Sequence, residues 1–345
     1  MNFGMVRVLL IVVMCSFAGA GIAMSGTEGV VPSPRTITVA LDGSGEFSSI
    51  QEAVDSAGKG DTVLIKAGVY PQDLTIHSKE KIKIIGVGIG QVVLQGRGQM
   101  VGVLHVGKWP YGATDIEISG LTINEHGGHA LGLFNGNRIV LRQLHVKGMV
   151  FSQQVQDVRI EDCVIGGSET TGAHFSDSQA TLVGNFIHDN DYGINVTGES
   201  SVRFERNVIT RSLFEAVVIG DQAAAVLVNN TLVKNGGGAT FLGASRIEAM
   251  GNIVSFNKVG FLISPSSQIR IGYNLLFNGE ADYMRAGSPN RPAPELKAKS
   301  DIFVDPRFVD AERDDFRLPS DTTLLNVGEF RYLGALPPRS SVSTQ

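Results

Sequence analysis

Hydrophobic and polar residues alternate at a period of two in short segments that recur throughout residues 116–284. Each segment follows one template: apolar, x, apolar, x, x, ladder residue, x, apolar. An early copy is Ile116-x-Ile118-x-x-Leu121-x-Ile123. Alternation at a period of two is typical of a strand with one buried face. The pattern therefore predicts short strands, and no copy contains a stretch with helical periodicity.

The ladder position sets the length of the repeat. Its occupants recur about every 22 residues, with one shorter step from Leu144 to Cys163, and a fixed period of this size indicates stacked structural units. They are Leu121, Leu144, Cys163, Asn185, Asn207, Asn230, Asn252 and Asn274. The Gly, Asn, Asp and Ser residues between the strands favour turns. Because stacked strands pair in parallel, we expect the five asparagines to form an inward amide ladder that satisfies buried backbone groups.

This repeat resembles the right-handed parallel β-helix of the pectin-lyase-like superfamily. The resemblance implies an all-β, single-stranded solenoid with coils of about 22 residues. We predict that it occupies residues 36–336, including a closing segment near residues 305–328. A short helix over residues 49–57, opened by a Ser48–Gln51 capping box, is expected to cap the first coil. Residues 337–345 form a Pro/Ser tail that we expect to be disordered.

Residues 1–23 have the pattern of an export signal. Arg7 supplies a positive charge, residues 8–14 are apolar, and Ala18-Gly19-Ala20 provides small residues for cleavage. A tether, residues 24–35, follows. We expect a periplasmic or extracellular protein with no membrane contact after cleavage; an uncleaved anchor and lipid attachment at Cys15 are the alternatives. Cleavage would leave only Cys163, so no intrachain disulfide is expected.

Composition limits the classes of partner that the protein is expected to bind. The chain has a net charge of −5 and no run of Lys or Arg. Duplex nucleic acid is therefore an unsuitable partner, because phosphate contacts require clustered positive charge. We expect no cofactor and no metal. Glu125-His126-Gly127-Gly128-His129 contains metal-ligand types, but its Gly-Gly turn is flexible and the pattern does not fix a third ligand in place.

The start of the predicted domain is similar to pectin methylesterases. The shared pattern comprises Val39, Asp42, Gly43, Ser44, Gly45, Phe47, Gln51 and Ala53. That family's mechanism needs two carboxylates, oxyanion-binding Gln side chains and an Arg, yet only Gln156-Asp157-Val158 approaches its catalytic motifs. The motifs of polygalacturonases and mannuronan epimerases are also absent, as is the acidic Ca²⁺ cluster of pectate lyases. The resemblance thus implies the fold without a standard catalytic set.

A candidate site lies on strands that follow the ladder residues. Alternation places Ala173 and Phe175 inward and turns the imidazole of His174 outward. Adjacent strands are about 4.8 Å apart, so His174 is expected to lie between Asn195 on the next coil and a Gln on the preceding one. His174 could act as a general acid or base, although a solvated polar face is the simpler explanation of the pattern. The expected substrate-binding residues are Gln153, Gln154, Ser176, Asn195, Thr197, Trp109 and Tyr111, the last two on a loop suited to stacking on sugars or packing over the cap.

The leading hypothesis is an exported β-helix protein that binds polysaccharide along its elongated face. One alternative is a polysaccharide lyase, epimerase or hydrolase that uses His174. The other is a periplasmic accessory factor similar to the NosD-type β-helix proteins of copper-enzyme maturation.

Overall fold

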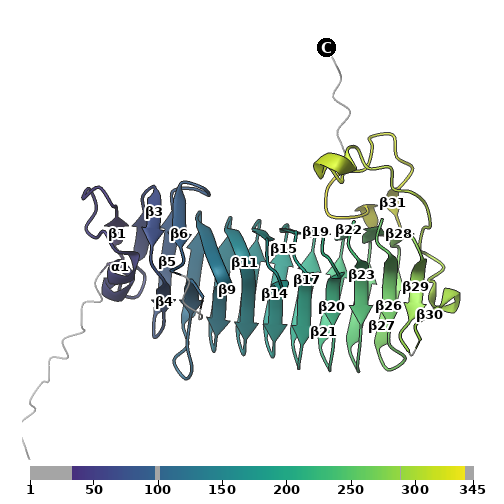
Figure 1. Cartoon of the computed structure of the whole chain (residues 1–345), viewed down its shortest axis with the longest axis horizontal. Coiled ribbons are helices and arrows are strands. Elements are labelled where there is room, and N and C mark those ends of the chain that lie inside the picture. Colours follow the sequence, from purple (N-terminus) through teal and green to yellow (C-terminus); the bar gives the residue numbers. More distant parts are fainter. Residues whose placement is uncertain (1–32, 98–101, 288, 339–345) are drawn as a thin grey trace, which may run out of the picture. The chain divides into compact units, whose positions relative to one another are not determined.

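Three parallel sheets build the structure, and each coil of the chain contributes a short strand to each sheet in turn (Figure 1). The computed structural model describes residues 33–97, 102–287 and 289–338. The predicted signal peptide, residues 24–32 of the predicted tether and residues 339–345 of the predicted tail lie outside the described residues. The described strands from Thr36 onward belong to one unit.

The first sheet, sheet A, contains the first strand of each coil. Its eleven described strands all pair in parallel. They are β1 (Thr36–Val39), β2 (Thr62–Ile65), β5 (Glu80–Gly86), β8 (Thr114–Ser119), β10 (Asn137–Arg142), β12 (Gln156–Glu161), β15 (Gln179–Val183), β18 (Ser201–Glu205), β21 (Ala224–Val228), β24 (Arg246–Met250) and β27 (Gln268–Gly272).

The other two sheets follow in the same coil. Sheet B comprises β3 (Gly68–Pro71), β6 (Val92–Gln95), the first parts of β9 (Thr122–Phe134) and β11 (His145–Gln153), β13 (Val164–Gly166), β16 (Phe186–His188), β19 (Val208–Thr210), β22 (Thr231–Val233), β25 (Ile253–Ser255) and β28 (Leu275–Phe277). Sheet C comprises β4 (Leu74–Ile76), β7 (Leu104–Val106), the later parts of β9 and β11, β14 (Thr171–Ser176), β17 (Tyr192–Thr197), β20 (Glu215–Ile219), β23 (Gly237–Phe241), β26 (Val259–Ile263) and β29 (Ala281–Arg285). The arrangement confirms the predicted parallel β-helix.

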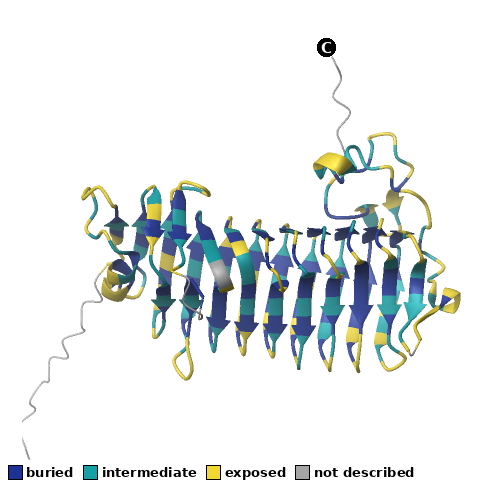
Figure 2. Cartoon of the chain, in the orientation of Figure 1, coloured by how far each residue is buried: buried dark blue, intermediate teal, exposed yellow. Residues whose placement is uncertain are grey.

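Apolar side chains stack in columns along the inside of the coils. In sheet C, Ala173 is in register with Ile194, and the column continues through Val217, Ala239 and Phe261. All of these residues are buried, as alternation predicts. Figure 2 shows buried stretches recurring along the strands of successive coils. Parallel register makes each buried residue pack against its equivalent one coil away, which joins the coils into one continuous apolar core.

The asparagine ladder runs along the turn between sheets A and B. Asn207 donates both its backbone N–H and its Nδ2 to Oδ1 of Asn230, at 2.9 and 3.0 Å. The same two bonds join each of the five asparagines to the next. Each Nδ2 also donates to a carbonyl of sheet A, such as that of Leu182. The buried turn thus has partners for its polar groups on every coil.

The ladder begins and ends at residues other than asparagine. At the start, the backbone N–H of Cys163 donates to Asn185 Oδ1 at 3.0 Å, and burial raises the pKa of the Cys163 thiol to about 12. At the other end, Asn274 donates to Asp301 Oδ1 through its backbone at 2.9 Å and through Nδ2 at 3.3 Å. The second carboxylate oxygen of Asp301 accepts a short hydrogen bond from Tyr283. A charged acceptor therefore closes the ladder at its last coil.

A second polar ladder, which we did not predict, lies in the turn between sheets B and C. Asn235 donates its backbone N–H and Nδ2 to Asn257 Oδ1 at 2.9 and 3.1 Å, and Asn257 does the same to Asn278. Asp282 accepts from Asn278 and ends the series. The residues recur at nearly the same period as the first ladder, and that recurrence was the available signal.

The N-terminal cap differs in detail from the prediction. Helix α1 spans Ile50–Ser56, and its N-cap is Ser49, whose hydroxyl accepts the backbone N–H of Glu52. The predicted Ser48–Gln51 box is therefore wrong by one residue. Gln51 instead pairs with the backbone of Thr75 in β4, accepting at 2.9 Å and donating at 3.1 Å. Its amide satisfies backbone groups that the first strand of sheet C would otherwise leave open.

After β29 the chain forms β30 (Arg291–Pro292), which pairs antiparallel with β29, and a short 3-10 helix (Pro294–Leu296). The C-terminal segment that follows folds back over the outer surface of sheet B and contains a second 3-10 helix (Ala311–Arg313) and the hairpin β31 (Leu325–Val327) with β32 (Phe330–Tyr332). Leu318 and Leu333 pack against Ile253 and Leu275. Nearer the middle of the sheet, Phe316 packs with Val208 and Val233. The segment thereby covers apolar residues on several of the last coils.

Candidate functional site

The outward face of sheet C carries an in-register column of side chains. Parallel pairing aligns His105, Gly132, Phe151, His174, Asn195, Val218, Thr240, Leu262 and Met284. A second column, two residues later, aligns Phe134, Gln153, Ser176 and Thr197. Neighbouring members of a column are about 4.8 Å apart because they stand on adjacent strands. The face thus presents outward side chains at a regular spacing along the stack of coils.

Aromatic rings occupy the first part of this face. The ring centroids of Phe134 and Phe151 are 5.8 Å apart, and Phe151 meets His174 edge-on at 5.5 Å. His105 meets Phe134 at 5.7 Å, and His129 lies 4.9 Å from Phe151. These distances fall within the range of favourable aromatic contacts. We name His105, His129, Phe134, Phe151 and His174 the aromatic row; its rings are half-buried and so remain partly accessible.

Gly132 makes the row possible. A Cβ at this position would come within 2.6 Å of the Phe134 ring and 2.8 Å of the His105 ring. The absence of a side chain in the column therefore lets the two rings approach each other over the backbone of β9.

Polar groups follow the aromatic row. The Nε2 atom of His174 lies 3.1 Å from Oγ1 of Thr197. Asn195 donates through Nδ2 to Thr171 Oγ1 at 3.1 Å. Its Oδ1 atom is buried and has no partner among the described residues.

His129 and His174, which both contact Phe151, favour the neutral form. Burial lowers the pKa of His174, with a smaller contribution from the nearby charge of His129. Burial also lowers the pKa of His129. A neutral imidazole can both donate and accept a hydrogen bond, so His174 is able to bind hydroxyl groups at neutral pH. Among the described residues, no group of three or more His, Cys, Asp or Glu side chains is arranged to hold a metal ion.

The structure places the predicted binding residues in three settings. His174, Asn195, Thr197, Ser176 and Gln153 share the outward face of sheet C. Gln154 lies in the turn after β11, where it has a φ of 54°. The prediction that a glutamine lies beside His174 is wrong, because Phe151 occupies that position and Gln153 aligns with Ser176. Because this repeat is shorter than the others, its register with the next coil could not be predicted from the sequence.

Trp109 and Tyr111 lie apart from that column, on the loop after β7. Their side chains are 77% and 58% exposed. The base of the loop adjoins the turn after β9, since a Cβ on Gly107 would clash with the carbonyl of Phe134 and one on Gly112 with that of Asn135. The loop therefore borders the aromatic row at Phe134.

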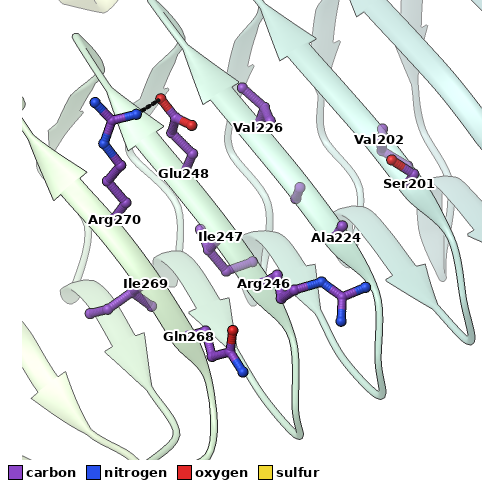
Figure 3. A pocket seen from close by; sticks show the side chains of 11 residues that line it. Ser201, Val202, Ala224, Val226, Arg246, Ile247, Glu248, Gln268, Ile269 and Arg270 are labelled. Atoms are coloured by element: carbon purple, nitrogen blue, oxygen red, sulfur yellow. Dashed lines mark hydrogen bonds and ion pairs between the residues drawn. The ribbon is translucent and has the colours of Figure 1, made fainter.

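A separate groove of about 410 Å³ lies on the outward face of sheet A, and sequence reasoning missed it (Figure 3). Ala224, Val226 and Ile247 form part of its lining. Arg270 points toward Glu248 and pairs with it at 3.0 Å, whereas Arg246 has no ion-pair partner among the described residues. Glu248 and Arg270 come from adjacent coils and are a full repeat apart in the sequence, so no local motif revealed their pairing.

Comparisons with known proteins agree with this architecture. The family model described as "Right handed beta helix region" matches residues 109–276. Pectate lyase Pel9A superposes with a TM-score of 0.52 and 13% sequence identity, over 90% of this chain and 98% of that chain. The chain is a right-handed parallel β-helix protein with the pectin-lyase-like fold.

Other similarities are more distant or shorter. The A-module of the Azotobacter vinelandii mannuronan C-5 epimerase AlgE4 is 16% identical, covers 74% of this chain and 95% of that module, and has a TM-score of 0.43. A probable pectinesterase/pectinesterase inhibitor of Arabidopsis thaliana is 45% identical over 60 residues. That match spans 17% of this chain and 12% of the relative. Among the described residues, no helix combines the length and apolar character needed to cross a membrane.

Proposed function

We propose that the protein binds a polysaccharide along the outward face of sheet C, with the aromatic row as its main platform. The observation that carries this proposal is the contact series from His105 through Phe134 and Phe151 to His174. Half-exposed rings offer apolar surface to the faces of sugar rings, while polar groups beside them bind hydroxyls. A polysaccharide repeats along its length, and so does this face.

The polar residues after the row support the same role. His174 and Thr197 form one hydrogen-bonding pair, and the half-buried Asn195 stands beside His174 on the next strand. These groups lie on two successive coils, so one chain of sugars could contact both. The proposal assigns the face a binding role with no catalytic step, consistent with the catalytic motifs absent from the sequence. It also includes export, for which the support is the pattern of residues 1–23.

The test is a binding screen on immobilised glycans, followed by affinity measurements on variants. Phe151→Ala and Phe134→Ala should each weaken binding about three- to tenfold, since an aromatic contact contributes about 0.5–1.5 kcal/mol. The matched control is Phe303→Ala, which removes a 39% exposed phenylalanine from the C-terminal segment. Equal affinity of Phe151→Ala and the parent for every bound glycan would refute the proposed face.

A further inference from the structure

The outward face of sheet C lacks the positive charge found on sheet A. The sheet C strands from β4 to β26, with β11 counted from Met149, contain no Lys or Arg. Arg285 in β29 is the first, and it pairs with Glu295 at 3.1 Å. Sheet A, by contrast, presents Lys83, Arg159, Arg203 and Arg270 in one outward column. Each of these four cations forms an ion pair with a glutamate of the same sheet. Sheet A therefore carries paired charges of both signs, whereas the sheet C strands from β4 to β26 offer no cation to a ligand.

Negative charge borders the sheet C face. Asp177, Glu199 and Asp221 are exposed in the turns that follow β14, β17 and β20. Asp177 accepts the backbone N–H of Glu199 at 3.0 Å, and Asp221 accepts that of Gly198 at 2.8 Å. These bonds hold the carboxylates of Asp177 and Asp221 in fixed positions at the edge of the sheet, on the coils before and after the one that contains Glu199.

A carboxylate also lies on the face itself. Glu215 extends over Gly237, where a Cβ would come within 3.0 Å of Glu215 Cγ, and the Thr240 hydroxyl donates to its Oε1 at 3.5 Å. A hollow of about 310 Å³ opens here. The lysine in its lining, Lys258, pairs with Glu280 at 3.3 Å, and Glu215 has no ion-pair partner among the described residues. The hollow therefore offers acceptors and uncompensated negative charge.

We propose that the sheet C face selects an uncharged, hydroxyl-rich polysaccharide over a polyuronate; this inference rests on the binding role proposed above. A polyuronate carries a carboxylate on each sugar, and each would need a cation or a hydrogen-bond donor at the face. The face instead carries Glu215 and is bordered by further carboxylates, and these negative charges repel the carboxylates of a polyuronate. Sugar hydroxyls are donors, and the carboxylate of Glu215 accepts from donors.

The experiment compares two probe classes on the full-length protein. Neutral probes are galactan, mannan and xyloglucan; anionic probes are polygalacturonate and alginate. Affinities are measured for the parent, for Phe151→Ala and for Asn195→Ala, with circular dichroism to verify folding of each variant. The second substitution keeps the test valid should the first disturb the core. We expect at least one neutral glycan to bind more than about tenfold tighter than either polyuronate, and both variants to weaken that binding.

A charge variant separates electrostatic selection from shape. Glu215→Gln keeps an acceptor oxygen and removes the charge, so it should raise polyuronate affinity relative to neutral-glycan affinity. Polyuronate binding that is tighter than neutral binding and is weakened by Phe151→Ala would overturn the inferred selectivity while retaining the proposed function. If neither Phe151→Ala nor Asn195→Ala weakens the binding of any glycan, the proposed function fails, and the inference fails with it.

Discussion

The imidazole of His174 lies between the ring of Phe151 on the preceding coil, at 5.5 Å, and the hydroxyl of Thr197 on the following coil, at 3.1 Å from Nε2. One side chain thus joins the aromatic part of the sheet C face to its polar part. This position explains why burial lowers the pKa of His174. It also makes His174 the residue at which binding and catalysis predict different results.

Replacing His174 distinguishes these two roles. For a binding protein, His174→Ala should weaken glycan affinity about two- to tenfold, because it removes one ring contact and one hydrogen bond. For an enzyme, the same change should lower the turnover rate by at least about 10²-fold, the usual contribution of a general acid or base. Calorimetric titration measures the first effect, and assays of unsaturated products and reducing ends measure the second. We expect the binding result; turnover by the parent that is lost in His174→Ala would contradict it.

The asparagine ladder should stabilise the fold strongly at its middle coil. Asn230→Leu removes the acceptor for the Asn207 backbone N–H and the donor to the Phe204 carbonyl. Because buried polar groups then lose their partners, the free energy of unfolding should fall by about 1–3 kcal/mol or more. Chemical denaturation measures this loss. Gln156→Leu, at an exposed position of sheet A, is the control and should change stability little; equal stability of the two variants would argue against the ladder's contribution.

The ion pair between Asp189 and Arg211 should make stability depend on acid pH. The hydrogen bond from Arg211 lowers the pKa of Asp189 from 3.8 to about 2 in the folded protein. A lowered pKa in the folded state means that the carboxylate stabilises the fold above pH 3.8 and that this contribution is lost as the pH falls through about 2. Asp189→Asn should therefore lower Tm at neutral pH, and the difference from the parent should shrink toward pH 2.

The same ion pair has a structural consequence that a second variant tests. Arg211 also contacts Asp314 in the C-terminal segment. Arg211→Gln should therefore lower Tm and increase proteolysis of that segment, whereas Asp189→Asn should mainly lower Tm. A constant Tm difference between Asp189→Asn and the parent over the whole acid range would show that the carboxylate contributes no pH-dependent stability.

The N-terminal cap should be required for a soluble β-helix. Deleting residues 36–60 removes β1 and α1, exposes the first strands of sheets A and C, and uncovers the buried contacts of Ile50, Ala53 and Val54. Exposed strand edges pair with other chains, so we expect aggregation. Light scattering after size-exclusion chromatography measures the outcome. A milder variant, Gln51→Leu, removes the amide that pairs with Thr75 and should lower Tm without deleting the helix. A monomeric, fully folded deletion protein would show that the cap is dispensable.

The repeat alone was sufficient to predict the β-helix. A period of about 22 residues, with alternation at a period of two, leaves one way to bury every apolar face, which is to stack the coils. It also indicated that Asn185 and the four later asparagines would share one inward position. The residue before each of them bends the chain, as at Arg206, whose φ is 53°, and the bend repeats because the turn does.

The surface of sheet C depended on the tertiary structure. Phe151 lies beside His174 because the coil between the ladder residues Leu144 and Cys163 is shorter than its neighbours, and a short coil can close in more than one register. Local alternation shows which residues point outward, but it does not show which of them align on adjacent coils. The charge of each face is decided in the same way, because charged residues of both signs are interleaved along the sequence. Only coiling of the chain gathers ion pairs such as Glu248–Arg270 on sheet A and leaves the sheet C face with rings, hydroxyls and the carboxylate of Glu215.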